Sequence, residues 1–474
     1  MRCSSTTAKC AVLSLLLTLL LIYRQTTSLP PVYLLDGRPG GAAAAYLAAD
    51  IGESAVRLAR AVGVTKLANA ACQNGHALPQ LLRRVSSSRA QQWAAARAYF
   101  WRQRPHVLRA AAEFELHPYW PRATNGTASF EALVGERAAA MAAALAADGR
   151  DDFVVEKDKC LMYAYLRRHC LPLAPVLRTW RGSPAEVRAA LLGMAADGGV
   201  AWPLYLKMCH LTQGPEDSVR QLRSAAWTAR HIDDVEAFVA SKWARRAHDA
   251  DRFLANAMDA ITSGLRAGAM AQAAFSSPAE LKVLVLWGRV YVAYVMAELS
   301  GVLTREGLFE RGCRACCVQQ QALPTPLAAV PELAWIARER QLPRAWLLAE
   351  TAAAAMGADQ VRIDIFLRKG APAALVVNEI SLHTGAPLHF HAEFAALLWS
   401  QTGRYKRYPA EGAWRRKVAG AALHQLGVGS AVPPPNLHAV LRGLHEMKAW
   451  GDNHSARIAQ CLGSKKPKPG RAAA

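Results

Sequence analysis

Hydrophobic and polar residues alternate along two neighbouring stretches near residue 360. Residues 361–367 (V-R-I-D-I-F-L) show the period of two that is typical of a half-buried strand, and residues 374–380 form a second apolar stretch of strand length. Gly370 lies between them and favours a turn. The pattern therefore predicts a β-hairpin with Arg362 and Asp364 on one face of its first strand.

The rest of the chain predicts more helix than strand. Helical patterns dominate residues 42–150, where the alanine-rich stretch 131–147 is the clearest. Further helices are predicted at 160–170, 186–196, 231–239, 331–356 with a break at Pro343, 392–398 and 437–449. Further strands are predicted at 173–179 and 202–208, with a hairpin formed by 283–286, the turn Trp287-Gly288 and 289–295.

Two carboxylates of the first hairpin suggest a metal site. Glu379 lies near the end of the second strand, so it shares a face with Asp364 if the two are opposite or two residues apart. Neighbouring carboxylates repel, and a hard divalent cation such as Mg²⁺ resolves the repulsion. Arg362 adds a positive group suited to phosphate. The alternative is a hairpin whose outer face carries ordinary solvated charges.

The first residues have the composition of a targeting segment. Arg2 and Lys9 precede an apolar run at residues 10–23. This run is shorter than the roughly 20 residues of a bilayer span, and it fits a signal peptide or a short signal anchor within residues 1–28. We therefore expect a chain of the secretory pathway, in the lumen of the endoplasmic reticulum or Golgi, membrane-anchored or secreted. In that setting Asn125 and Asn453 are glycosylation acceptors.

Charge and cysteine content add two expectations. The net charge of +21 favours anionic partners, but no nucleic-acid-binding motif accompanies it, so we expect no nucleic acid partner. The C-x-x-C-C run at 313–317 has no second ligand pair at zinc-finger spacing, which favours disulfides or free thiols over zinc. His383, His389 and His391 could likewise suggest zinc, but such histidines more often cap loops or line a pocket.

Four sequence pieces stand in order from residue 156 onward. They are E-K-D-K-C-L-M-Y, W-P-L-Y-L-K-M-C-H-L-T-Q-G, P-A-E-L-K-V-L-V and the 361–380 hairpin. Their order resembles the ATP-grasp superfamily, most closely its polysaccharide-associated branch related to teichuronopeptide biosynthesis. The resemblance covers residues 151–400. It implies an α/β (α+β) fold in which two subdomains grip ATP, after a helical region at 29–150 and before a helical extension with a basic tail at 401–474.

The resemblance also assigns roles to individual residues. By position, Lys207 contacts the nucleotide phosphates, while Asp364 and Glu379 hold magnesium. Arg362 contacts phosphate or the acyl intermediate and counts with Lys207 as catalytic. Glu280 and Lys282 belong to the nucleotide pocket. Two positions depart from the family pattern: Ser381 stands where many members have Asn, and the loop after Lys207 has Gly214 where many members have several glycines.

The implied activity is a Mg-ATP-dependent ligation of a carboxylate to an amine through an acyl phosphate. The expected substrate is an acidic glycan, a glycan-linked acid or a small carboxylate. Phosphorylation of a glycan by the same fold is an alternative, and so is a type II lumenal glycosyltransferase. The sequence has neither an isolated D-x-D motif nor a dinucleotide-binding glycine pattern, which disfavours the latter. A further alternative is a non-catalytic binding protein with a degenerate fold of this type.

Overall fold

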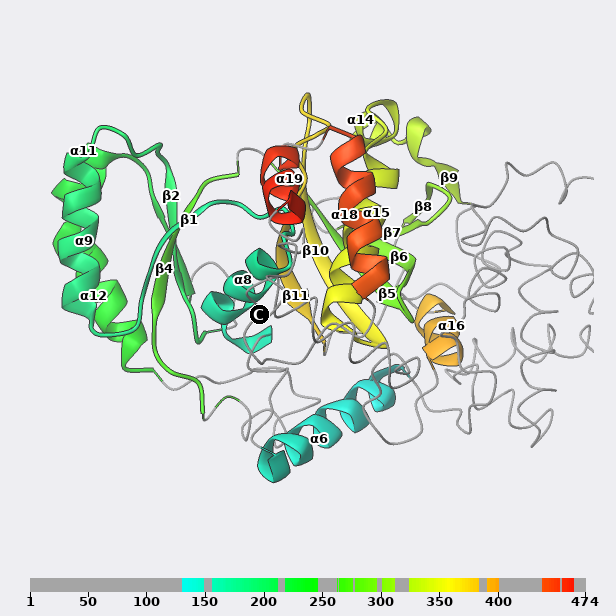
Figure 1. The fold of residues 1–474 in the computed structure, drawn as a ribbon, viewed down its shortest axis with the longest axis horizontal. Helices are drawn as coiled ribbons and strands as arrows, with labels where there is room; N and C mark the ends of the chain where they lie inside the picture. Colours follow the sequence, from blue (N-terminus) through cyan, green and yellow to red (C-terminus); the bar gives the residue numbers. More distant parts are fainter. Residues whose placement is uncertain are drawn as a thin grey trace, which may run out of the picture. The chain divides into compact units, whose positions relative to one another are not determined.

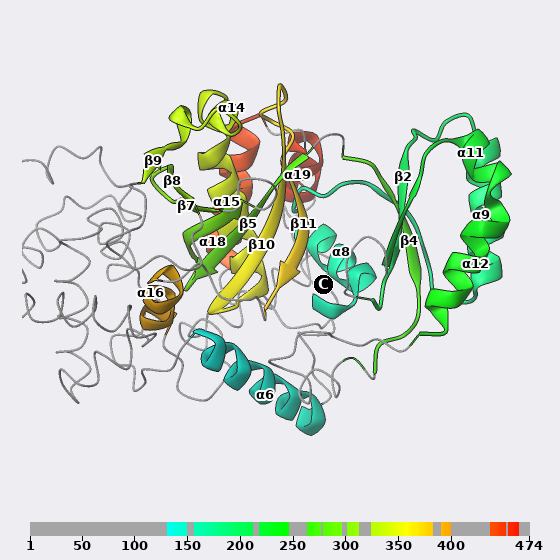
Figure 2. The same ribbon diagram turned by 180° about the vertical axis from the view of Figure 1, so that it is seen from behind.

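The computed structural model describes residues 130–148, 156–211, 218–245, 262, 264–275, 278–295, 301–311, 324–382, 390–399, 437–451 and 454–463. All of them belong to Arg57–Ala474, one of the two compact units into which the chain divides. Figures 1 and 2 show these residues from opposite sides. They form a mixed α/β fold whose strands make two antiparallel sheets.

The first sheet has four strands in the order β1-β4-β2-β3. Its strands are β1 (Val176–Trp180), β2 (Leu204–Met208), β3 (Val219–Leu222) and β4 (Ala269–Ala273). Three helices pack together on one face of it, α9 (Pro184–Ala196), α11 (Ala225–Arg230) and α12 (Ile232–Trp243) (Figure 1). Strand β2 alternates, with Leu204 and Leu206 buried in this core and Lys207 half-buried on the opposite face. The strand thus directs Lys207 away from the helices.

The second sheet has seven strands in the order β11-β10-β5-β6-β7-β8-β9. They are β5 (Pro278–Leu286), β6 (Arg289–Val295), β7 (Gly301–Thr304), β8 (Leu308–Arg311), β9 (Thr325–Pro326), β10 (Gln360–Arg368) and β11 (Val376–Ser381). Both predicted hairpins are present. Trp287 and Gly288 join β5 to β6 with φ of 49° and 80°, the left-handed backbone that a tight two-residue turn requires.

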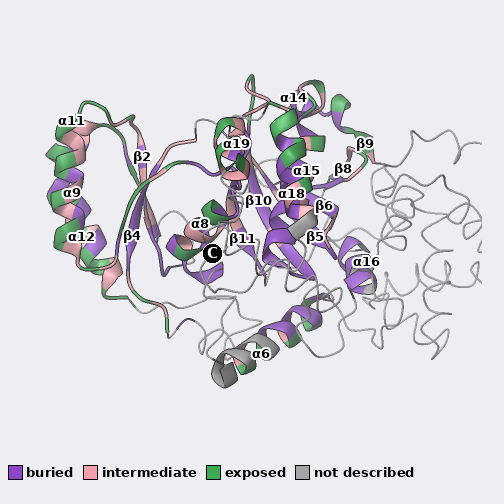
Figure 3. Cartoon of the chain, viewed as in Figure 1, coloured by how far each residue is buried: buried purple, intermediate pink, exposed green. Residues whose placement is uncertain are grey.

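Helices surround the seven-stranded sheet. They are α6 (Phe130–Asp148), α8 (Lys159–Arg168), α14 (Ala334–Arg338), α15 (Gln341–Met356), α16 (Phe390–Trp399), α18 (Leu437–Ala449) and α19 (Ser455–Gly463), with a short 3-10 turn at Leu327–Ala329. Helix α15 contacts β10 and β5, and α18 packs on α15, where Gly443 lies directly against Thr351 and leaves no space for a side chain. Figure 3 shows the resulting contrast between the buried strands β10 and β5 and the exposed outer surfaces of α9 and α12.

Two disulfides connect distant parts of the chain. Cys160 pairs with Cys209 and Cys170 with Cys461, with Cα–Cα distances of 5.2 Å and 6.1 Å that fall in the usual range. The first joins the start of α8 to the segment after β2, and the second joins the end of α8 to α19. The expectation that some cysteines pair is therefore confirmed for these four residues. The C-x-x-C-C run lies outside the described residues.

The predicted helix break at Pro343 is wrong. Helix α14 ends at Arg338, and α15 begins at Gln341 after Arg340, whose φ of 52° interrupts the helix. Pro343 sits in the first turn of α15, where a missing N–H leaves no intrahelical bond unmade. The sequence patterns also missed β3, β4 and β7 to β9, together with α11 and α19.

Several sequence expectations fall on residues that the structure does not describe. They include the leader, both glycosylation acceptors, and the 29–150 and 401–474 regions apart from α6, α18 and α19. Among the residues that the structure does describe, none of the helices combines the length and the apolar character needed to cross a membrane.

Candidate active site

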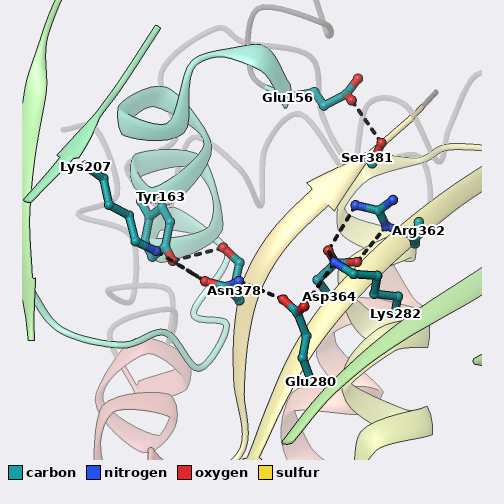
Figure 4. A network of polar contacts seen from close by, with 9 residues as sticks. All are labelled: Glu156, Tyr163, Lys207, Glu280, Lys282, Arg362, Asp364, Asn378 and Ser381. Atoms are coloured by element: carbon teal, nitrogen blue, oxygen red, sulfur yellow. Dashed lines mark hydrogen bonds and ion pairs between the residues drawn. The ribbon is translucent and has the colours of Figure 1, made fainter. Parts of the chain in front are cut away.

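The predicted carboxylate pair lies side by side on the seven-stranded sheet. Asp364 in β10 is directly opposite Glu379 in β11, and on its other side it is opposite Lys282 in β5. Arg362 is opposite Ser381 in the same register. Because residues directly opposite share a face, these five side chains line one side of the sheet. Figure 4 shows four of them, Lys282, Arg362, Asp364 and Ser381. A β-bulge follows Asp364 in the pairing with β11.

Asp364 is fully buried and bound by two cations. Arg362 donates to it from Nε at 2.7 Å and from Nη2 at 3.0 Å, and Lys282 Nζ donates at 2.7 Å. Lys282 also pairs with Glu280 at 3.0 Å. Burial works to lower the pKa of both Lys282 and Arg362, but the charge and hydrogen bonds of Asp364, together with nearby glutamates, outweigh it and raise the pKa of each. The carboxylate is thus held in place by protein cations.

Glu379 has a different environment. It is half-buried, and its side chain makes no hydrogen bond or ion pair with any other residue in the described part of the chain. Its charge acts on its neighbours at longer range, since it opposes the lowering of the pKa of Lys159 and Lys207. The two predicted metal ligands therefore differ. Asp364 is bound by protein cations, whereas the oxygens of Glu379 are open to a ligand.

Lys207 reaches this sheet from the four-stranded one. Its Nζ donates to Asn378 Oδ1 at 3.3 Å and lies 5.7 Å from the centre of the Tyr163 ring (Figure 4). Burial lowers the pKa of Lys207 to about 8, although Glu379 and Glu280 oppose that change. No carboxylate of the described residues lies within ion-pair distance of this amine. Lys207 thus contacts the second strand of the 361–380 hairpin.

Lys159 belongs to the same site, although sequence reasoning gave it no role. It is the first residue of α8, and its Nζ donates to Leu211 O at 2.7 Å and Ser218 Oγ at 3.0 Å. Burial lowers the pKa of Lys159 to about 8, with Glu379 opposing and Lys207 reinforcing the change. The K-D-K run before the helix was the available signal. Its Asp158 caps α8, accepting from Leu161 N at 3.1 Å.

Asn378 and Tyr163 connect Lys207 to the seven-stranded sheet. Tyr163 OH donates to Asn378 O at 2.9 Å, and Asn378 Nδ2 donates to Glu280 Oε1 at 3.0 Å. Burial raises the pKa of Tyr163, so its hydroxyl stays protonated and remains a donor. Sequence reasoning placed Asn378 beside Glu379 but assigned it no contact, and it missed Tyr163. Both depend on α8 lying against β11, which no local pattern reveals.

A second polar pair lies further along β11. Ser381 Oγ donates to Glu156 Oε1 at 3.2 Å, and Lys157 Nζ lies 3.6 Å from the same oxygen. All three residues are buried. Glu156 therefore brings a third carboxylate to the end of the hairpin face, where Ser381 holds one of its oxygens.

Other predicted residues do not join this site or fall outside the described residues. Gly214, His383 and His389 are among those that the structure does not describe. His391 lies in α16, where its Nδ1 and Nε2 contact Tyr291 and Glu310, each at 3.2 Å. It belongs to a buried polar cluster of the sheet core and not to the Asp364 site.

The residue types suit an anionic nucleotide and a divalent cation. Lys159 and Lys207 present half-buried amines that no carboxylate of the described residues contacts, and such amines fit phosphate oxygens. Glu379 offers free oxygens beside Asp364, and carboxylate oxygens are preferred by Mg²⁺. The donor set therefore fits both groups that the sequence suggested.

Comparison with known proteins gives only distant likenesses. No protein-family model matches the chain, and no curated protein matches it either. Similar solved structures include a biotin carboxylase–ATP complex from Campylobacter jejuni, with 12% identity and a TM-score of 0.31. The match covers 52% of this chain and 47% of that one. A 2-oxoglutarate carboxylase biotin carboxylase domain from Hydrogenobacter thermophilus, complexed with MgADP and bicarbonate, has 12% identity, TM-score 0.29 and coverage of 53% and 47%.

A RimK domain ATP-grasp protein from Sphaerobacter thermophilus is also similar, with 15% identity, TM-score 0.27 and coverage of 55% of this chain and 73% of that one. The chain spans about half the length of the two carboxylase structures. All three TM-scores are low, and these likenesses carry no inference about activity.

Proposed function

We propose that the chain is a Mg-ATP-dependent ligase that joins a carboxylate to an amine. The observation that carries this proposal is the convergence of Lys159 and Lys207 on the open carboxylate of Glu379, beside Asp364. Lys159 from the start of α8 and Lys207 from β2 thus lie near the Asp364–Glu379 pair of the seven-stranded sheet. This is the combination that transfer of a phosphoryl group from ATP requires, because such transfer depends on charge neutralisation and positioning.

The proposed reaction has two steps. A substrate carboxylate oxygen attacks the γ-phosphorus of ATP, the bond to the β-γ bridging oxygen breaks, and ADP leaves. The amine nitrogen of the second substrate then attacks the acyl carbon, loses a proton and releases phosphate. Lys159 and Lys207 would hold phosphate oxygens, and Asp364 and Glu379 would hold Mg²⁺, which would supply neutralisation of the charge on the phosphates. Arg362 fixes Asp364 and presents its outer edge to the acyl group.

We further propose an acidic glycan or glycan-linked acid as the carboxylate substrate. The net charge of +21 supports an anionic polymer, as does the resemblance to polysaccharide-associated proteins. The two disulfides support a place in an oxidising compartment such as the secretory lumen. Localisation of a tagged chain, with and without its first 28 residues, tests that compartment.

Calorimetry and product analysis test the ligase. We expect the purified chain to bind ATP with magnesium and not UDP-sugars, and to release ADP and phosphate when acid and amine are both present. Hydroxylamine in place of the amine should trap the acyl phosphate as a hydroxamate. Transfer of labelled γ-phosphate to a glycan hydroxyl, without phosphate release, would identify a kinase instead.

Matched variants locate the activity in the site. Lys207→Ala should weaken ATP binding, whereas Lys369→Ala, which changes an exposed lysine in the turn of the same hairpin, should not. Binding of UDP-sugars alone would favour the glycosyltransferase alternative and overturn the proposal.

A further inference from the structure

Asn378 lies between Lys207 of the four-stranded sheet and Glu280 of the seven-stranded sheet and bonds to both. Its Oδ1 accepts from Lys207 Nζ at 3.3 Å, and its Nδ2 donates to Glu280 Oε1 at 3.0 Å. Figure 4 shows the amide lying between the two charged groups. Each end of the amide therefore faces the charge that it can bind, and the opposite orientation of the side chain would satisfy neither.

A second contact fixes the backbone at this position. Tyr163 OH donates to Asn378 O at 2.9 Å and lies 3.5 Å from Asn378 Oδ1. The Tyr163 side chain is buried, and its ring also lies beneath the Lys207 amine. The amide is thus held from α8 while it joins β2 to β5, so its position is set by three separate elements.

We propose that Asn378 is a positioning residue that binds the Lys207 ammonium without neutralising it and keeps it apart from Glu280, so that the ammonium stays available to an anionic ligand. This inference rests on the proposed function for the identity of the ligand, ATP, but not for the geometry. A carboxylate at this position would form an ion pair with Lys207. An apolar residue would leave the ammonium free to turn toward the nearby carboxylates.

The charges around the amine make the neutrality of Asn378 important. Glu280 in β5 and Glu379 in β11 act on Lys207, Lys159 in α8 lies close enough to repel it, and Tyr163 faces it with a neutral hydroxyl. The side chain that directly contacts the ammonium is the uncharged amide. A ligand phosphate can then replace one neutral hydrogen bond, and it does not have to break an ion pair.

Two substitutions separate this role from that of a simple hydrogen-bond acceptor. Asn378→Asp keeps the shape and the acceptor but adds a negative charge, whereas Asn378→Leu removes both polar contacts. We expect Asn378→Leu to weaken ATP binding about tenfold, the effect of losing one hydrogen bond to a charged group. Asn378→Asp should weaken it more, because the phosphates must displace a carboxylate. If Asn378→Asp binds ATP as well as the wild type, the proposal is overturned.

A double-mutant cycle with Lys207→Met shows whether Asn378 acts through the lysine. If it does, Asn378→Leu combined with Lys207→Met should bind ATP no more weakly than Lys207→Met alone. Fully additive losses would indicate a general structural role and would contradict the proposal. Gln221→Glu, the same kind of amide-to-carboxylate change at an exposed position of β3, is the matched control and should leave binding unchanged. Unfolding curves of each variant confirm that the fold is kept.

A ligand-free measurement keeps the two proposals distinguishable. The rate at which an acylating reagent labels Lys207, followed by mass spectrometry against pH, reports the ionisation of this amine without any nucleotide. Asn378→Asp should shift the labelling curve to higher pH, and Gln221→Glu should not. If the wild type binds no nucleotide, the proposed function fails while this labelling still decides the role of Asn378. An unshifted curve in Asn378→Asp overturns that role.

Discussion

Lys207→Met tests whether the site holds its amine at a cost in stability. Burial lowers the pKa of Lys207 from its ordinary value of 10.5 to about 8, and Glu379 and Glu280 only partly oppose that change. A lowering of this size corresponds to roughly 3 kcal/mol of unfavourable charge burial, since one pKa unit is about 1.4 kcal/mol. Lys207 is half-buried, so solvent screening reduces the effect. We expect the variant to be more stable than the wild type by about 1–3 kcal/mol at pH 7.

The dependence on pH follows from the direction of the shift. The folded-state pKa of Lys207 lies below the unfolded value, so the unfolded chain binds the proton more tightly. The penalty is therefore present in full below pH 8, and it is relieved as the pH rises from about 8 to 10.5. The stability advantage of the variant should be greatest at pH 7 and mostly lost at pH 10, where the folded wild type has already released the proton.

Urea unfolding of both proteins at pH 7 and pH 10 measures this difference. Lys369→Met, at an exposed position in the β10–β11 turn, is the control and should change stability little at either pH. The same Lys207→Met protein should lose ATP affinity, which would show that stability and binding are opposed at this residue. A variant less stable than the wild type at pH 7, or a difference that is equal at both pH values, would refute the reasoning.

Three further changes have distinct expected outcomes. Glu379→Gln should abolish turnover in an ADP-release assay while leaving the unfolding midpoint nearly unchanged, because the Glu379 side chain makes no hydrogen bond or ion pair with the other described residues; added magnesium should restore part of the rate. Asp364→Asn should also abolish turnover but lower stability by about 3–5 kcal/mol in urea unfolding, because it removes the buried negative charge that both Lys282 and Arg362 contact. Replacing Cys160 and Cys209 by Ser should weaken ATP binding, whereas removing the Cys170 disulfide should lower thermal stability without that loss.

The hairpin could be predicted from sequence because its signals are local. Period-two alternation and the turn glycine specify β10 and β11, and the pairing of Asp364 with Glu379 follows from strand length and turn position. Strand β4 (Ala269–Ala273) could not be predicted in this way, since alanine has a poor strand propensity and only its two neighbouring strands hold it in the sheet. Its structure is decided by tertiary contacts.

The site was predicted in its residue types but not in its contacts. Lys207, Asp364 and Glu379 were identified, yet the two cations that hold Asp364 come from β10 itself and from β5, which lies 82 residues away. The sequence indicated that Asp364 and Glu379 both hold magnesium and gave no difference between them. The structure distinguishes them, because Asp364 is engaged by protein and Glu379 is not. Such a difference depends on neighbours in space, and it has no signature along the chain.

The charge balance of the site explains why an anionic ligand would stabilise the fold. The site combines Lys159, Lys207, Lys282 and Arg362 with Glu280, Asp364 and Glu379. Lys282 and Arg362 are satisfied by Asp364, which leaves two half-buried amines, those of Lys159 and Lys207, whose hydrogen-bond partners are uncharged oxygens. Buried charges without a counter-charge are costly, and a bound phosphate supplies one.

The lowered pKa values of Lys159 and Lys207 should therefore rise when such a ligand binds, so ligand binding takes up protons near pH 8. Calorimetry in buffers of different ionisation enthalpy measures that uptake, and the absence of any uptake would show that neither amine contacts the ligand.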